Sequence, residues 1–190
     1  MIKAIIFDLF GVLANEGTVS FSRAFYPKDE IKLGQTQKLQ DRLNLGQMNI
    51  DEYKDQLASL GGTDRKTVDS YIDYHQPNLP LLEYIKTALK PKYKVGILSN
   101  SGDDWTKEIL GEHLSIFDTV VLSYRVGLIK PDARIYELAV QRLGVQLPEA
   151  VFTDDKARYC EGAMNAGMLA IEYENYEQFK DELEKILTSS

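Results

Sequence analysis

Short apolar runs recur along this chain and are separated by segments with helical spacing. The first run, Ile5-Ile6-Phe7, ends abruptly at Asp8, and Gly11 then breaks the pattern. Similar runs cover Tyr93–Leu98, Thr119–Leu122, Ala150–Thr153 and Met168–Ile171. Runs of this length without polar alternation are typical of strands buried on both faces of a parallel sheet. Because helices alternate with these strands, we predict an α/β fold with right-handed crossovers, a doubly wound (Rossmann-like) parallel sheet.

Residues 17–76 have a different character, with helical spacing and no convincing strand. We expect helices over about Ser20–Tyr26 and Glu30–Leu43, and a third from Asn49, where Glu52 completes a capping box. Thr63 is expected to cap a fourth helix. The pattern predicts a helical cap subdomain, residues 15–77, inserted after the first strand of a core formed by residues 1–14 and 78–190.

Polar side chains follow three of the predicted strands. They are Asp8, the pair Ser99-Asn100, and the pair Asp154-Asp155. The carboxyl ends of parallel strands meet at one edge of the sheet, so these groups are expected to converge. Carboxylates that close would repel unless a cation lay among them, and an all-oxygen site suits Mg²⁺.

Lys130 precedes Pro131, which we place in the first turn of a helix, and could lie at the same edge. A magnesium ion, a lysine, a hydroxyl and turn amides together suit a phosphoryl group. On the residues alone, simpler interpretations stay open. Asp8 could cap a turn, Ser99 and Asn100 could form an ordinary turn, and Lys130 could be a solvated lysine.

Composition and charge limit the classes of partner that the protein is expected to bind. The net charge of −7 and a pI of about 4.9 argue against nucleic acid and anionic membranes, but not against a small phosphorylated ligand. The single cysteine, Cys160, excludes an internal disulfide and is expected to be a buried small hydrophobe. We find no stretch long enough to span a bilayer and no room for a signal peptide before the first strand. We therefore expect a cytoplasmic protein, and a monomer.

Four motifs, in order, resemble those of the haloacid dehalogenase superfamily of phosphatases and related hydrolases. They are Asp8-Leu9-Phe10-Gly11-Val12-Leu13, Leu98-Ser99-Asn100, Lys130-Pro131, and Phe152-Thr153-Asp154-Asp155 leading into Glu161-Gly162-Ala163 and Ala166-Gly167-Met168. The motifs span almost the whole chain, and the helical insertion resembles that superfamily's small cap. Each motif is weak alone, whereas four in order are specific.

The resemblance implies a nucleophile and a metal site. Asp8 would attack phosphorus and form an aspartyl-phosphate intermediate. Mg²⁺ would be held by the side chains of Asp8 and Asp154 and by the backbone carbonyl of Phe10. Asp155 would support the metal through water or orient Lys130.

The resemblance also implies a phosphate site. Ser99, with amides near Asn100, would hold the phosphoryl oxygens, and Lys130 would neutralise charge on the nucleophile and phosphate. The implied substrate is a small phosphorylated metabolite, similar to a sugar phosphate.

The chain departs from the family pattern at Phe10. Most family phosphatases carry a second aspartate there, which protonates the leaving group and later activates water. Such acid–base help is worth about 10² to 10⁴ in rate. Two alternatives follow: a metal-independent, dehalogenase-type hydrolase, or a catalytically impaired member that binds a phosphometabolite or a partner. The pair Asp154-Asp155 favours the magnesium-dependent interpretation, since three metal-free carboxylates would repel one another.

Other positions carry weaker signals. Tyr159 stands where relatives commonly have asparagine. His75 lies near the junction of cap and core, where we expect a hinge or surface role more than a place in the pocket. Four cap residues are candidates for substrate contact, and the sequence does not choose among them: Arg23, Tyr26, Arg42 and Gln47.

Overall fold

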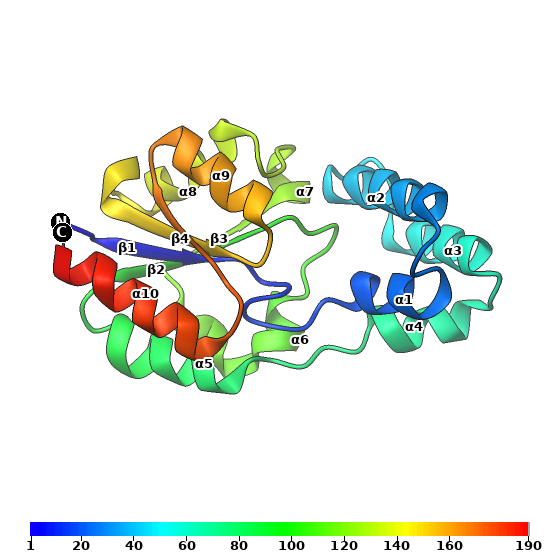
Figure 1. Cartoon of the computed structure of the whole chain (residues 1–190), viewed down its shortest axis with the longest axis horizontal. Coiled ribbons are helices and arrows are strands. Elements are labelled where there is room, and N and C mark those ends of the chain that lie inside the picture. Colours follow the sequence, from blue (N-terminus) through cyan, green and yellow to red (C-terminus); the bar gives the residue numbers. More distant parts are fainter. Residues whose placement is uncertain (190) are drawn as a thin grey trace.

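Five parallel strands form the centre of the molecule, a computed structural model that describes residues 1–189 (Figure 1). The strands are β1 (Ala4–Phe7), β2 (Lys94–Ser99), β3 (Thr119–Leu122), β4 (Ala150–Asp154) and β5 (Leu169–Glu172). They are ordered β3-β2-β1-β4-β5, and every neighbouring pair is parallel. The predicted doubly wound α/β sheet is therefore confirmed.

Strand β1 lies at the middle of this sheet and is buried on both faces. Ala4 and Ile6 belong to the hydrophobic cluster on one face, and Ile5 and Phe7 to the cluster on the other. All four side chains are completely buried. Because successive side chains of a strand point to opposite faces, a strand covered on both sides needs the continuous apolar run seen in the sequence.

Helices cover both faces of the sheet. The helices of the chain are α1 (Gly17–Phe25), α2 (Glu30–Asn44), α3 (Ile50–Gly61), α4 (Arg65–Ile72), α5 (Leu79–Tyr84), α6 (Thr106–Leu110), α7 (Ser123–Val126), α8 (Ala133–Leu143), α9 (Ala157–Ala166) and α10 (Tyr176–Ser189), with the π-helix η1 (Ile85–Leu89) and the 3₁₀ helices η2 (Gly111–Ile116) and η3 (Leu147–Glu149). Helices α5, α6 and α10 lie on one face, and α8 and α9 on the other (Figure 1). Within residues 1–189, none of the helices has the length and apolar character needed to cross a membrane.

Helices α1–α4, which we call the helical insertion, pack around a cluster of their own between β1 and β2. Its core includes Phe21, Tyr53 and Leu57, which are fully or almost fully buried. The capping box of Asn49 and Glu52 is present at the start of α3, as predicted.

Two helix starts differ from the sequence-based expectation. Asp64, not Thr63, caps α4, because its carboxylate accepts the backbone N–H of Thr67 at 2.7 Å. Pro131 is not in the first turn of α8. The carboxylate of Asp132 accepts the N–H of Arg134 at 3.0 Å, and the helix begins after that cap.

Hydrogen bonds from opposite sides fix the helical insertion over the carboxyl ends of the strands (Figure 1). In the two connecting segments, the Asn15 amide donates to the Tyr74 carbonyl at 2.8 Å, and the Asn78 amide donates to the Val12 carbonyl at 2.9 Å. On the α2 side, the buried Ser123 hydroxyl donates to the Asn44 carbonyl at 2.6 Å. The two connecting segments are thus joined to each other, and the end of α2 is joined directly to the core.

Candidate active site

Asp8 follows the last residue of β1, at the edge of the sheet that faces the helical insertion. Its side chain is 8% exposed, and its Oδ1 lies 3.0 Å from the Lys130 ammonium. The backbone N–H of Leu9 donates to the same oxygen at 2.8 Å. Both contacts are to Oδ1, so they orient the carboxylate and leave Oδ2 as the oxygen available for reaction.

Lys130 lies between two carboxylates. Its side chain is completely buried, and its ammonium donates to Asp154 Oδ2 at 2.5 Å in addition to its contact with Asp8. The Tyr159 ring, at the position that departs from the family pattern, lies 4.9 Å from the same ammonium. A cation over an aromatic face is stabilised by the ring quadrupole. The resemblance placed Lys130 beside the nucleophile, and the structure brings them together.

The pKa values reflect this crowding. Burial raises the pKa of Asp8 to about 6; Lys130 opposes this rise and Asp154 adds to it. Burial lowers the pKa of Lys130, but Asp154 and Asp8 outweigh that effect and the net shift is upward. The pKa of Asp8 and the pKa of Lys130 can both be raised, because a single ammonium faces two carboxylates. Lys130 therefore stays charged while the carboxylates remain under-neutralised.

A third carboxylate completes a cluster suited to a cation. Asp8, Asp154 and Asp155 each offer an oxygen, and these oxygens lie within 4.8 Å of one another. Asp155 Oδ1 is buried and has no hydrogen-bond partner among the described residues, and burial raises the pKa of this carboxyl to about 7. Three carboxylates against one ammonium, with an orphaned oxygen, fit a hard divalent cation such as Mg²⁺. Asp155 makes no ion pair with Lys130 within residues 1–189.

The turn after β1 is shaped to admit Asp155. Gly11 has a φ of +89°, a region that favours glycine, and a Cβ there would collide with the Asp155 carboxylate. The Gly11 position therefore lets the Phe10-containing turn approach the acidic cluster. The Phe10 carbonyl as a metal ligand stays a prediction.

The two residues expected to hold phosphate differ in their surroundings. Ser99 ends β2, and its hydroxyl is buried with no partner among the described residues. The Asn100 side chain instead accepts the Lys130 N–H at 2.8 Å and donates to the Lys130 carbonyl at 3.1 Å. The Asn100 amide group therefore fixes the backbone that carries Lys130, a positioning role that the sequence did not reveal.

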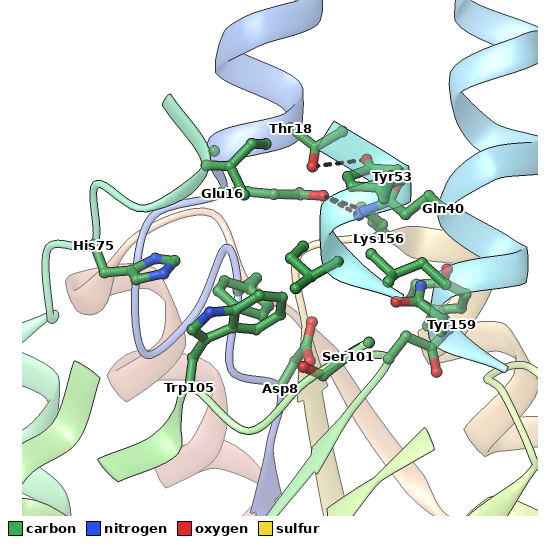
Figure 2. A pocket seen from close by; sticks show the side chains of 18 residues that line it. Asp8, Glu16, Thr18, Gln40, Tyr53, His75, Ser101, Trp105, Lys156 and Tyr159 are labelled. Atoms are coloured by element: carbon green, nitrogen blue, oxygen red, sulfur yellow. Dashed lines mark hydrogen bonds and ion pairs between the residues drawn. The ribbon is translucent and has the colours of Figure 1, made fainter. Parts of the chain in front are cut away.

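A cavity that is partly open to solvent lies between the sheet edge and the helical insertion. Figure 2 shows the side chains that line it. From the core and the connecting segments come Asp8, Phe10, Glu16, His75, Asn100, Ser101, Gly102, Trp105, Lys156 and Tyr159; from the helical insertion come Gly17, Thr18, Gln40, Leu43, Asn44, Ile50, Tyr53 and Ile72. The cavity therefore combines the candidate nucleophile with groups from both parts of the molecule.

Several lining residues were missed by sequence reasoning. Lys156 directly follows the acidic pair, so its position in that motif could have pointed to it. Glu16 lies in a connecting segment, where no periodicity marks it. Conversely, none of the four candidate cap residues lines the cavity. The Tyr26 hydroxyl bonds to Thr36 inside the insertion, and the other three, Arg23, Arg42 and Gln47, are exposed.

Phe10 is part of an aromatic group on the cavity wall. Its ring centroid lies 5.7 Å from those of both His75 and Trp105. His75 lies in the connecting segment and lines the cavity, so the expectation that it would lie outside the pocket was wrong, whereas its hinge role stays a prediction. Burial lowers the pKa of His75, although Glu108 and Asp73 oppose the shift. A phenyl ring thus occupies the position where the family pattern has a proton donor.

Comparisons with known proteins identify the family of this chain. The family model for haloacid dehalogenase-like hydrolases matches residues 2–167. The chain is 28% identical to a D-ribitol-5-phosphate phosphatase from Bacteroides thetaiotaomicron over the full length of both proteins. It is 29% identical to a glyceraldehyde 3-phosphate phosphatase from Methanocaldococcus jannaschii, over 90% of this chain and 84% of that protein.

Solved structures show the same fold. A HAD family enzyme from B. thetaiotaomicron, determined with magnesium and inorganic phosphate, gives a TM-score of 0.72 at 22% identity, covering 94% of this chain and 99% of that one. An L-2-haloacid dehalogenase from Xanthobacter autotrophicus gives 0.67 at 20% identity, covering 97% and 83%. On the family model, which covers most of its length, this chain belongs to the haloacid dehalogenase-like hydrolases.

Proposed function

We propose that this protein is a Mg²⁺-dependent phosphatase of a small phosphorylated metabolite, similar to a sugar phosphate, with Asp8 as the nucleophile. The observation that carries the proposal is the placement of Asp8, held through one oxygen by Lys130 and lying beside Asp154 and Asp155. The names of the two curated relatives, both phosphatases of small phosphorylated compounds, support the substrate class.

The chemistry assigned to Asp8 follows from its contacts. Lys130 and the Leu9 N–H hold Oδ1, so Oδ2 attacks phosphorus while the bond to the ester oxygen breaks. The leaving oxygen takes up a proton from solvent water and departs as an alcohol. Water then hydrolyses the aspartyl phosphate, which restores Asp8 and releases phosphate.

The metal and the neighbouring side chains would stabilise different negative charges during the reaction. Mg²⁺, held by Asp8, Asp154 and the Phe10 carbonyl and supported by Asp155, would supply positive charge to the phosphoryl oxygens. Lys130 offsets charge on the nucleophile, and Ser99 with the amides near Asn100 would contact the phosphoryl oxygens. Asn100 also holds the Lys130 backbone in place.

Phe10 sets an expectation for the leaving group. Its ring cannot donate a proton, so esters whose leaving group departs without one, such as aryl phosphates or sugar 1-phosphates, should react faster than simple alkyl phosphates. The difference expected from a missing acid is about 10² to 10⁴ in rate.

We further propose that residues 15–77 act as a cap over a core of residues 1–14 and 78–190. Glu16, Thr18, Gln40 and Tyr53 line the same cavity as Asp8, so closure over a substrate would surround its non-phosphate part and exclude water.

The test is hydrolysis of p-nitrophenyl phosphate by the wild type and by Asp8→Asn. We expect activity that requires Mg²⁺, disappears with EDTA, and falls at least a thousandfold in Asp8→Asn. Asp181→Asn, the same change on an exposed residue of α10, serves as the control and should match the wild type. Full activity with asparagine at position 8 would refute the proposed nucleophile.

Because Phe10 replaces the usual proton donor, two alternative functions are tested as well. Chloride release from 2-chloropropionate in EDTA would identify a metal-independent dehalogenase. Binding of phosphate analogues with Mg²⁺ but without turnover would identify a binding protein. The acidic cluster argues against both alternatives, because its three carboxylates share the Lys130 ammonium and Asp155 Oδ1 has no partner among the described residues.

A further inference from the structure

An ion pair spans the cavity between the helical insertion and the core. The Glu16 carboxylate, from the segment that enters α1, lies 2.9 Å from the Lys156 ammonium, from the loop between β4 and α9. Their side chains are 11% and 30% exposed, so the pair is largely shielded from solvent. The Gln40 amide lies 3.5 Å from the same Glu16 oxygen. Figure 2 shows this pair directly above Asp8.

The ion pair determines the charge that a ligand meets. Among the residues that line the cavity, Lys156 is the one lysine or arginine, and its charge is matched by Glu16. A second anionic group on a ligand would therefore find no free cation on the cavity wall.

The rest of the insertion-side wall is neutral. The Thr18 hydroxyl and the Tyr53 hydroxyl lie 3.1 Å apart in a hydrogen bond, and the Gln40 amide is beside them. Hydroxyl and amide groups both donate and accept hydrogen bonds, so they match the hydroxyl groups of an alcohol. Ile50 and Ile72 complete this wall with apolar surface.

We propose that Glu16 is a specificity residue that restricts the substrate to phosphate esters with an uncharged, hydroxyl-bearing remainder. This inference rests on the proposed phosphatase function and adds the chemical class of the leaving group. A carboxylate or second phosphate in this cavity would be repelled by Glu16 and left without a partner, which is costly in a shielded site. A hydroxyl at the same place would find Thr18, Tyr53 or Gln40.

The first test uses two pairs of ligands that differ at one terminal group, which is uncharged in one member and a carboxylate in the other. Glycerol 3-phosphate and 3-phosphoglycerate differ by a hydroxymethyl against a carboxylate group, as do sorbitol 6-phosphate and 6-phosphogluconate. Competitive inhibition of p-nitrophenyl phosphate hydrolysis is measured, so turnover of these ligands is not needed. In at least one pair, we expect the neutral member to bind at least tenfold more tightly. Equal inhibition within both pairs, including none, would overturn the proposal.

The second test removes the charge of Glu16. In Glu16→Gln, Lys156 loses its counter-ion, so the inhibition constants of the carboxylate-bearing ligands should fall at least tenfold relative to their neutral partners. The double variant Glu16→Gln with Lys156→Gln should lose that gain. Glu30→Gln, the same change on an exposed residue outside the cavity, should leave the ratio unchanged.

The two proposals fail in different ways. An unchanged ratio in Glu16→Gln, with p-nitrophenyl phosphate still hydrolysed, would refute the role of Glu16 and leave the phosphatase intact. Absence of any hydrolysis dependent on Mg²⁺ and Asp8 would refute the proposed function, and this inference with it. If Glu16→Gln does not fold, the wild-type comparison of the ligand pairs decides the question alone.

Discussion

Lys130→Met probes how strongly the active-site carboxylates depend on one cation. The change keeps most of the side-chain length and apolar stem but removes the ammonium. In the structure that ammonium is completely buried, 3.0 Å from Asp8 and 2.5 Å from Asp154. Without it and without a metal, three carboxylates remain together with no cation between them.

The size of the effect follows from that geometry. Removing one partner of a buried ion pair costs about 3–5 kcal/mol of unfolding free energy. Because two carboxylates lose their partner here, we expect a cost in the upper part of that range, about 4–5 kcal/mol. For a chain of this length, each kcal/mol shifts the melting temperature by about 2–4 °C, so Tm should fall by about 8–20 °C in EDTA at pH 8.

The pH dependence gives the sharper check. The pKa of Asp8 is already raised from 3.8 to about 6 in the folded wild type, and loss of Lys130 raises it further. When the pKa of a carboxyl is higher in the folded state than in the unfolded state, the group stabilises the fold at pH values below the unfolded-state pKa. That stabilisation is lost as the pH rises through the folded-state pKa. The loss of unfolding free energy in Lys130→Met, relative to the wild type, should therefore become smaller as pH falls from 8 to 5.

Thermal and urea unfolding of the wild type, Lys130→Met and the exposed control Lys38→Met, all in EDTA, provide the measurement. The control should stay within about 0.5 kcal/mol of the wild type, since it removes a charge from the surface. Unchanged stability of Lys130→Met at pH 8, or a larger deficit at pH 5, would show that Lys130 does not neutralise the cluster.

Three further outcomes are expected. Phe10→Asp should raise turnover of alkyl phosphates by about 10² or more relative to p-nitrophenyl phosphate, because it supplies a proton donor; equal acceleration of both in steady-state kinetics would count against this. Gly11→Ala should displace Asp155 and so weaken Mg²⁺ binding measured by calorimetry. Gly34→Ala, at an open position on α2, should leave Mg²⁺ binding unchanged. Ser123→Ala removes the buried hydroxyl that joins the insertion to the core and should cost about 1–3 kcal/mol in urea unfolding.

The site residues that could be predicted are those that end strands. Asp8 and Asp154 converge because parallel strands of one sheet terminate at the same edge, a rule that needs only the order of elements. Lys130 precedes a helix rather than ending a strand, and only the family pattern assigned it firmly. Its loop is held by the Asn100 side chain, a contact between segments 30 residues apart that no local pattern encodes.

Residues in the connecting segments could not be predicted in the same way. Glu16 and His75 belong to no helix or strand, and their directions depend on long-range hydrogen bonds such as that between Asn15 and Tyr74. The misplaced helix starts have a local cause. Neighbouring residues, such as Thr63 and Asp64, compete as caps, and the outcome depends on which one adopts the extended backbone that precedes the first turn.

The junction of α2 with the core bears on how the proposed cap would open. Leu43 packs so closely on Gly102 that a Cβ there would collide with it, and the Asn44 carbonyl accepts the Ser123 hydroxyl beside it. Any outward swing of α2 has to expose that leucine and break that hydrogen bond before product can leave through this side. If the insertion acts as the proposed cap, this small contact would help to set how long product stays in the cavity. A larger residue at position 102 would collide with Leu43, so on the same assumption we expect it to disturb this contact and shorten that stay.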